Sequence, residues 1–329
     1  MNDDAVEVTP DLTGHARFLI MTAARAPSVH NTQPWRFRVS PEAVEVWSDL
    51  GRKLKTDPLG REMLISCGAA LFGLRLAIRS LGYLPVTDLF PDPARLRLLA
   101  RVRPGAAMPA GERERRLLEA VPHRHTHRGP FTDGPLPAGL VVGLQHDALA
   151  EGAALALVDG RLAYQRLADL VAAAARRGNP DPLAQADIHR WTRDPASTAK
   201  DGIPASAFSA RPDHRAGTLP QRDFDLGRGL GRLSGGDDSP PVTAVLLTGT
   251  DTRMSWLQAG QALQRLLLHA ATKWVFASLL TQPLENAVTR DLIRARLALP
   301  GSPQMLLQLG RAANAPATAR REPDELADP

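Results

Sequence analysis

The chain has 329 residues, enough for two domains of ordinary size or one large domain. Hydrophobic residues make up 43% and charged residues 23%, which excludes a wholly disordered chain, and the 26 glycines and 28 prolines follow no collagen-like repeat. The net charge is +5, and only four of the 40 basic residues are lysine. Arginine suits phosphate binding, but most of these arginines are interspersed with acidic residues, so we attribute the excess mainly to codon usage in a GC-rich genome.

Cysteine content and hydropathy limit the class of protein further. Cys67 is the only cysteine, which excludes an intrachain disulfide and a cysteine-based zinc site. It lies in an apolar run and is expected to be a small buried hydrophobe. No uncharged apolar stretch reaches the ~18 residues of a membrane helix, and the acidic N-terminus precedes no signal-peptide core. We therefore expect a cytoplasmic protein.

The first hundred residues alternate between helical and strand patterns. A helical pattern stops at Pro27, and Trp35, Phe37 and Val39 alternate with arginine as in a half-buried strand. Asp57-Pro58 is a typical helix start, and the helix it opens is apolar on nearly all sides, so it should be central and buried. The expected elements are a helix at 11–26, strands at 35–39 and 44–47, a helix at 58–81, strands at 84–89 and 96–102, and a linker at 103–109.

A second round of elements follows this linker. A β-rich run between Pro-Pro and glycine predicts a strand, and a long apolar helix should come after it. Residues 195–240 are rich in Gly, Pro, Ser and Asp and lack periodicity, which is typical of a lid or a binding loop. The expected elements are helices at 112–121, 137–149, 161–177, 181–193, 252–280 and 285–297, and strands at 153–158, 242–248 and 304–309.

Each half of the chain therefore combines a long apolar helix with strands of antiparallel type. This organisation predicts an α+β fold with two related halves, residues 1–110 and 111–329, the second carrying the candidate lid at 195–240. No internal sequence identity is strong enough to establish a repeat.

The loop between the first helix and the first strand holds small and polar residues, Ala-Pro-Ser-Val-His-Asn-Thr-Gln-Pro-Trp at 26–35. Ser28, Asn31 and Gln33, beside free backbone N–H groups, could hold a flat polar heterocycle. An ordinary helix-to-strand loop with local side-chain bonds explains the same residues. The residues alone favour the ordinary loop.

A basic segment, His-Arg-His-Thr-His-Arg-Gly-Pro-Phe, opens the second half at 123–131. Arg124 and Arg128, with a hydroxyl and imidazoles between them, are suited to hold a phosphate. A zinc site of His123, His125 and His127 on one face of a strand is an alternative, but the arginines disfavour it. A plain solvated segment is the second alternative, and we rank it between the other two.

These segments together resemble the flavin-dependent nitroreductase family. The loop at 26–37 is similar to the family's A-P-S-x-x-N-x-Q-P-W-x-F segment, and 124–131 is similar to its R-[RH]-S-x-[RK]-x-F segment, with Thr126 in place of serine and one extra residue before Phe131. The tail pair Arg320-Arg321 is similar to the family's C-terminal basic pair. The resemblance implies FMN bound by Pro27, Ser28, Asn31, Arg124, His125, Thr126, Arg128, Arg320 and Arg321.

The order of these segments departs from that of ordinary family members. In those proteins the basic segment precedes the A-P-S loop, and each FMN lies between two subunits. Here the loop is in the first half and the basic segment in the second, as in the fused, Acg-type branch of the family. The resemblance therefore implies a nitroreductase-like fold of two fused halves, with one FMN per chain. We expect this arrangement to make the chain a monomer.

The resemblance also implies how such a protein works. FMN would be reduced by NAD(P)H, which then leaves, and a nitro or quinone compound would be reduced next; no catalytic side chain is expected. A flavin-storing stress protein with little turnover, its FMN covered by the lid, is the alternative. A departure at 272–277, Thr-Lys-Trp-Val-Phe-Ala where relatives tend to have Gly-Leu, puts access to the flavin ring in doubt. We expect a small-molecule substrate and neither a metal, a nucleic acid nor a membrane as partner.

Overall fold

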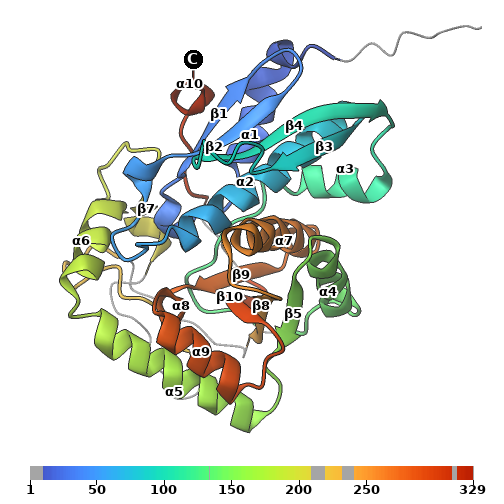
Figure 1. Ribbon diagram of the computed structural model, residues 1–329. Helices are drawn as coiled ribbons and strands as arrows, with labels where there is room; N and C mark the ends of the chain where they lie inside the picture. Colours follow the sequence, from blue (N-terminus) through green and yellow to red (C-terminus); the bar gives the residue numbers. More distant parts are fainter. Residues whose placement is uncertain (1–9, 133, 209–218, 232–240, 313–316, 329) are drawn as a thin grey trace, which may run out of the picture.

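A computed structural model describes residues 10–132, 134–208, 219–231, 241–312 and 317–328. The first half forms a four-stranded antiparallel sheet in the order β1-β2-β4-β3, with Trp35 opposite Ser48 at one end of the β1–β2 hairpin (Figure 1). Its helices and strands are α1 (Ala16–Ala24), β1 (Trp35–Val39), β2 (Val44–Ser48), α2 (Arg61–Ser80), β3 (Tyr83–Leu89) and β4 (Leu98–Ala107).

The second half forms another four-stranded antiparallel sheet, in the order β5-β8-β10-β9. A short parallel pair of strands, β6 and β7, lies apart from it. The helices and strands of this half are α3 (Glu112–Glu119), α4 (Leu140–Ala150), β5 (Ala154–Leu157), α5 (Arg161–Gly178), α6 (Pro182–Trp191), β6 (Thr192–Arg193), β7 (Ile203–Pro204), β8 (Val242–Thr248), α7 (Arg253–Ala271), β9 (Phe276–Leu280), α8 (Gln282–Glu285), α9 (Ala287–Arg296), β10 (Ser302–Gly310) and α10 (Pro323–Leu326).

The two sheets differ in how much of each is covered. One face of the first sheet packs on α1 and α2, and burial along β1 and β2 alternates accordingly. In the second sheet α7 covers one face, while α5, α8 and α9 cover the other. Strands β8 and β10 are therefore buried almost without alternation, as continuous apolar runs should be.

The long helices α2 and α7 pack against each other at the centre of the molecule, and two glycines allow their backbones to touch. A Cβ atom on Gly68 would lie 2.1 Å from the carbonyl oxygen of Leu257, and one on Gly260 would lie 2.0 Å from that of Ile65. Side chains from both sheets join one apolar core around this crossing. Helix α2 is long and apolar enough to cross a membrane, but 89% of its apolar window is buried, as expected of a core helix.

The C-terminal tail crosses back to the first half. Helix α10 packs against α1, and beyond it the backbone N–H of Asp328 donates a hydrogen bond to the carbonyl of Phe37 in β1 at 2.7 Å. Figure 1 shows α10, near the C-terminus, beside β1, which lies near the start of the sequence. This return brings the residues just before α10, including the basic pair, to the first half.

The structure corrects two of the predicted elements. The helix predicted at 252–280 is wrong beyond Ala271, because a turn at 272–275 with Trp274 at φ 54° ends α7, and Phe276–Leu280 pairs with β10 as strand β9. A short apolar run fits a buried strand and a buried helix equally well, so its pattern alone could not decide. The linker predicted at 103–109 is also wrong: β4 continues to Ala107 and pairs with β3 through a register shift.

Other boundaries move less. The N-cap of α2 is Gly60 rather than Asp57, although the Asp57 carboxylate accepts a hydrogen bond from the N–H of Met63. The helix predicted at 285–297 is two helices, α8 and α9, divided at Asn286. Within the candidate lid at 195–240, the stretches 195–208, which contains β7, and 219–231 are described, whereas 209–218 and 232–240 lie outside the described residues.

Candidate functional site

The A-P-S loop, residues 26–37, is held in an unusual backbone conformation. His30, Asn31 and Gln33 have φ of 47°, 54° and 49°, in the left-handed region that few residues other than glycine adopt. The Ser28 hydroxyl accepts a hydrogen bond from the N–H of Gln33 at 3.0 Å, and the Ser66 hydroxyl on α2 accepts one from Val29 at 3.2 Å. Such conformations persist where the surroundings impose them, often at functional sites.

Further contacts tie this loop to the second half. The Asn31 side-chain amide donates to the carbonyls of Gly202 at 2.9 Å and Ala319 at 3.2 Å, and the Gln33 amide donates to that of Lys200 at 2.9 Å. The start of the candidate lid is thus bound to the loop. Asn31 therefore acts as a bridge between segments. Its Oδ1 atom is buried and accepts no hydrogen bond from the described residues.

The basic segment runs between the two halves, along the edge of β9. The N–H of His127 donates to the carbonyl of Ala277 at 2.9 Å, and the buried Arg124 donates to the carbonyl of Arg25, at the end of α1, at 2.9 Å. The three histidines do not converge: His123 is exposed beside Trp274, while the His127 ring bonds to the carbonyl of Pro130. No group of metal-ligating side chains occurs among the described residues.

The C-terminal basic pair reaches the same place. Arg320 donates hydrogen bonds to the carbonyls of Ala24 at 2.9 Å and Ala26 at 3.1 Å, directly before the A-P-S loop. The backbone N–H of Arg321 donates to the Gln33 side-chain oxygen at 2.9 Å, while its guanidinium bonds to the carbonyl of Glu325. The fold therefore brings together three segments that are far apart in the sequence.

Where these segments meet, Arg25, Arg124, Arg128 and Arg320 form an arginine cluster. Burial lowers the pKa of Arg124 to about 10, and repulsion from Arg128 and Arg25 adds to the effect; burial alone lowers that of Arg128 to about 10. The pKa of Arg320 is lowered in the same way, by burial and by the other three arginines. No carboxylate among the described residues pairs with Arg124, Arg128 or Arg320.

Several donors of this cluster have no partner among the residues that the structure describes. Nε and Nη1 of Arg124 and Nη1 of Arg128 are buried and form no hydrogen bond with the described residues. Burial, with repulsion from Arg124 and Arg320, lowers the pKa of the neighbouring His125 to about 4, so this ring is neutral at pH 7. Unpaired buried cations are costly, so the arrangement fits an anion that accepts several hydrogen bonds, such as a phosphate.

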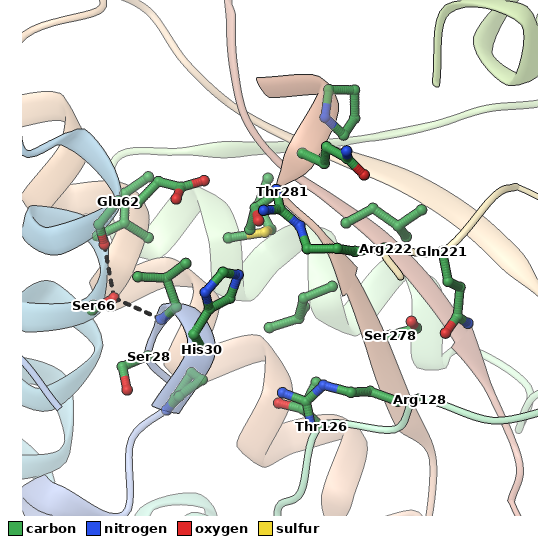
Figure 2. Close-up of a pocket in the computed structure, with 18 of the residues that line it drawn as sticks. Ser28, His30, Glu62, Ser66, Thr126, Arg128, Gln221, Arg222, Ser278 and Thr281 are labelled. Atoms are coloured by element: carbon green, nitrogen blue, oxygen red, sulfur yellow. Dashed lines mark hydrogen bonds between the residues drawn. The ribbon is translucent and has the colours of Figure 1, made fainter. Parts of the chain in front are cut away.

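A cavity, partly open to solvent, extends between the halves (Figure 2). One wall comes from the A-P-S loop and α2, and the other from the basic segment, β9 and β10. Residues of both walls include Pro27, Ser28, His30, Glu62, Ser66, Thr126, Arg128, Ser278, Thr281 and Met305.

The stretch 219–231 closes one side of this cavity. Arg222 lines the cavity and forms an ion pair with Glu285 at the end of α8. The ring of Phe224 packs edge-on against His30, with ring centres 5.4 Å apart, and the Arg128 guanidinium lies 6.0 Å from it. The described part of the candidate lid is therefore a wall of the cavity.

The predicted site residues fall into three groups. Pro27, Ser28, Thr126 and Arg128 line the cavity, whereas Arg124 and Arg320 belong to the arginine cluster and His125 lies beside it. Asn31 and Arg321 hold segments together. Residues 272–277, where access to the flavin ring was in doubt, do not line the cavity, and Trp274 is exposed.

Sequence reasoning missed several residues of the cavity. Glu62 interrupts an apolar helix, and a charge in such a position is a signal that could have been used. Arg222 and Phe224 lie in a phrase that resembles the family, but no local pattern shows which part of an irregular stretch returns to the site. The missed residues are Glu62, Arg222, Phe224, Ser278 and Thr281.

Comparisons with known proteins identify relatives over almost the whole chain. No family model matches it. It is 36% identical over 314 residues to a protein of Mycobacterium tuberculosis (strain ATCC 25618 / H37Rv) named "Putative NAD(P)H nitroreductase Rv3131", a match covering 93% of this chain and 89% of the relative. A second protein of that strain, "Putative NAD(P)H nitroreductase acg", is 30% identical over 328 residues, covering 97% and 96%.

The solved structures that match are less similar in sequence than these relatives. The FMN and NADPH-dependent nitroreductase NfnB from sphigopyxis sp. strain HMH is 18% identical, covers 64% of this chain and 97% of its own, and has a TM-score of 0.41. The α+β fold class predicted from the sequence is confirmed by the helices and the two antiparallel sheets of the structure. Because the curated relatives match almost the whole chain at 30–36% identity, the chain belongs to the NAD(P)H nitroreductase family, in its Acg-type branch.

Proposed function

We propose that this protein binds one FMN per chain and uses it as an NAD(P)H-dependent oxidoreductase that reduces nitro or quinone compounds. The observation that carries the proposal is the arginine cluster of Arg25, Arg124, Arg128 and Arg320. It lies beside the cavity, and buried donors of Arg124 and Arg128 form no hydrogen bond with the described residues. The relatives named as NAD(P)H nitroreductases support the same function.

The residues of the site fit FMN in charge and in shape. Arg124, Arg128 and Arg320 would hold the phosphate: Arg124 and Arg128 offer buried N–H donors that form no hydrogen bond with the described residues, and Arg320 adds a third positive charge. Pro27, Ser28 and Thr126 would lie along the flavin in the cavity between the two halves. When bound, FMN supplies the two-electron chemistry, so these residues bind and orient rather than react.

The origin of the three segments explains why one chain would be enough to form the FMN site. The A-P-S loop comes from the first half, and the basic segment and the basic pair come from the second. All three meet within a single chain. The proposed protein is therefore active as a monomer, and gel filtration of the flavin-loaded protein tests this point.

A second candidate function, flavin storage with little turnover, is favoured by one observation. Arg222 and Phe224 occupy a side of the cavity, and the ion pair between Arg222 and Glu285 fastens this wall. A wall fixed there would hinder entry of the nicotinamide. This function requires the same FMN site and differs only in access to it.

The visible spectrum and the turnover of the purified protein separate these functions. We expect a yellow protein that oxidises NADPH when menadione or nitrofurazone is added. A yellow, fully loaded protein without turnover would leave flavin storage as the function. A colourless protein that takes up no FMN would refute both.

A further inference from the structure

Glu62, the second residue of α2, is a buried acid that the proposed binding of FMN does not use. Its side chain is 3% exposed and lines the cavity, and neither carboxyl oxygen forms a hydrogen bond with the described residues. Figure 2 shows its carboxyl group directed away from the α2 ribbon, toward the side of the cavity where Arg222 and Thr281 lie. A group of this kind, bare and facing a ligand cavity, is available to a bound molecule.

The cations near Glu62 are engaged elsewhere. Arg61 lies 3.7 Å from Glu62 Oε1, but its guanidinium donates to the backbone and side-chain oxygens of Gln304 at 2.9 and 3.0 Å and to the carbonyl of Leu284 at 3.3 Å. Arg222 is paired with Glu285. Arg222 Nη1 forms no hydrogen bond with the described residues, so neither cation is hydrogen-bonded to Glu62.

The charges around Glu62 favour its protonated form. Burial is the main cause, and the nearby Glu285 and Asp57 repel a further negative charge more than Arg61 and Arg222 compensate, which raises the pKa of Glu62 to about 8. At pH 7 the carboxyl group therefore carries a proton. It can donate that proton to an oxygen atom within reach.

The other polar groups of the cavity are less suited to this task. His30 is buried and beside Arg222 and Arg128, which holds its pKa well below 6.5, so its ring is neutral at pH 7. The Ser66 hydroxyl already donates to the carbonyl of Glu62 at 2.7 Å. Arginine keeps its proton throughout the physiological range. Glu62 is thus the strongest neutral acid among the cavity residues that the structure describes.

We propose that Glu62 donates a proton to the oxygen of the nitro or quinone acceptor as the acceptor is reduced. The proposal rests on the proposed function. A quinone or a nitro group takes up two electrons and two protons: both electrons and one proton come from the reduced cofactor, and the second proton comes from Glu62. In a nitro group one N–O bond then breaks, and its oxygen leaves as water with the two protons, so that a nitroso group remains. The O–H bond of Glu62 breaks, a new O–H bond forms on the acceptor, and the Glu62 carboxylate then regains a proton from solvent.

Two oxidants distinguish this role from a structural one. p-Benzoquinone needs protons to be reduced to the hydroquinone, whereas ferricyanide accepts one electron and no proton. In single-turnover reoxidation of reduced, FMN-loaded protein at pH 7, Glu62→Gln should slow the reaction with p-benzoquinone about 100-fold and leave that with ferricyanide unchanged. Glu62→Asp, which keeps a carboxyl group, should recover part of the quinone rate, and Glu119→Gln on the exposed surface should match the wild type.

Infrared spectroscopy gives a readout that is independent of turnover. FMN-loaded protein labelled with ¹³C-glutamate should show the band of a protonated carboxyl group that disappears as the pH rises through about 8, and Glu62→Gln should lack this band. If Glu62→Gln does not fold, Glu62→Asp gives the same test. Because aspartate is unlabelled, the labelled band should be lost and the band of an unlabelled carboxyl group should replace it.

The outcomes for the two proposals are distinct. Equal slowing with p-benzoquinone and ferricyanide, equal rates in the variant and the wild type, or the absence of a labelled band that titrates near pH 8 would overturn the role of Glu62. Loss of FMN binding by the wild type, or its failure to react with ferricyanide, would instead refute the proposed function.

Discussion

Replacing Arg124 by methionine tests whether the arginine cluster holds a phosphate. Methionine keeps much of the volume of the side chain and removes its charge and its N–H donors. Two of its nitrogen atoms, Nε and Nη1, are buried and form no hydrogen bond with the described residues, and Nη2 donates to the carbonyl of Arg25. The bound phosphate should therefore lose two charge-assisted hydrogen bonds.

The size of the effect follows from those two bonds. Each hydrogen bond to a charged group contributes about 1.5–3 kcal/mol. Relief of the repulsion that Arg128 and Arg25 exert on Arg124 reduces the loss, so we use the lower limit, about 3 kcal/mol in all. At ~1.4 kcal/mol per tenfold, FMN should bind about 100-fold more weakly.

Fluorescence titration with FMN and with riboflavin, which lacks the phosphate, measures this effect directly. We expect Arg124→Met to weaken FMN binding and leave riboflavin binding unchanged, and the protein without flavin to melt at the same or a higher temperature, because a repelled buried cation is gone. Arg116→Met, on an exposed arginine, is the matched control. Equal losses for both flavins would refute the assignment of the phosphate to this cluster.

Three further predictions concern packing, pH and access. Gly68→Ala should lower the free energy of unfolding by about 3 kcal/mol or more, because its Cβ would meet the Leu257 carbonyl at 2.1 Å, whereas Gly14→Ala, with open space around it, should leave the melting temperature nearly unchanged. Burial opposes ionisation of Asp147, but hydrogen bonds, first of all that with His269, outweigh burial and lower the pKa of this carboxyl group. Asp147→Asn should therefore lower the free energy of unfolding by about 3 kcal/mol at pH 7. This difference from the wild type should shrink as the pH falls below about 4, because the wild-type carboxylate is then protonated. Phe224→Ala should speed reduction of bound FMN by NADPH in stopped-flow measurements, and an unchanged rate would show that 219–231 does not limit access.

The sequence sufficed for the segments whose signals are local. The A-P-S loop, the basic segment and the basic pair stand out by residue type, and the structure brings them together although nearly 200 residues separate Arg124 from Arg320. Periodicity likewise located the central part of α2 and the strand β8. Such features are determined by residues that are close in the sequence, so sequence patterns can predict them.

The features that failed or were missed depend on distant parts of the chain. Strand β9 read as the end of a helix because only pairing with β10 distinguishes a buried strand from a buried helix. Glu62 becomes an unusual acid only because α8 and the stretch 219–231 enclose it. Gly68 and Gly260 have no local turn to explain them, and their role is visible only where α2 and α7 touch.

The flavin content of the protein tests the central claim most directly. The purified chain is incubated with FMN, passed through a desalting column, and its flavin and protein are quantified, with its molecular mass in solution measured on the same sample. The account predicts one FMN per chain in a monomer, since one chain supplies the loop, the basic segment and the basic pair. Protein that retains no FMN, or one FMN shared by two chains, would contradict it.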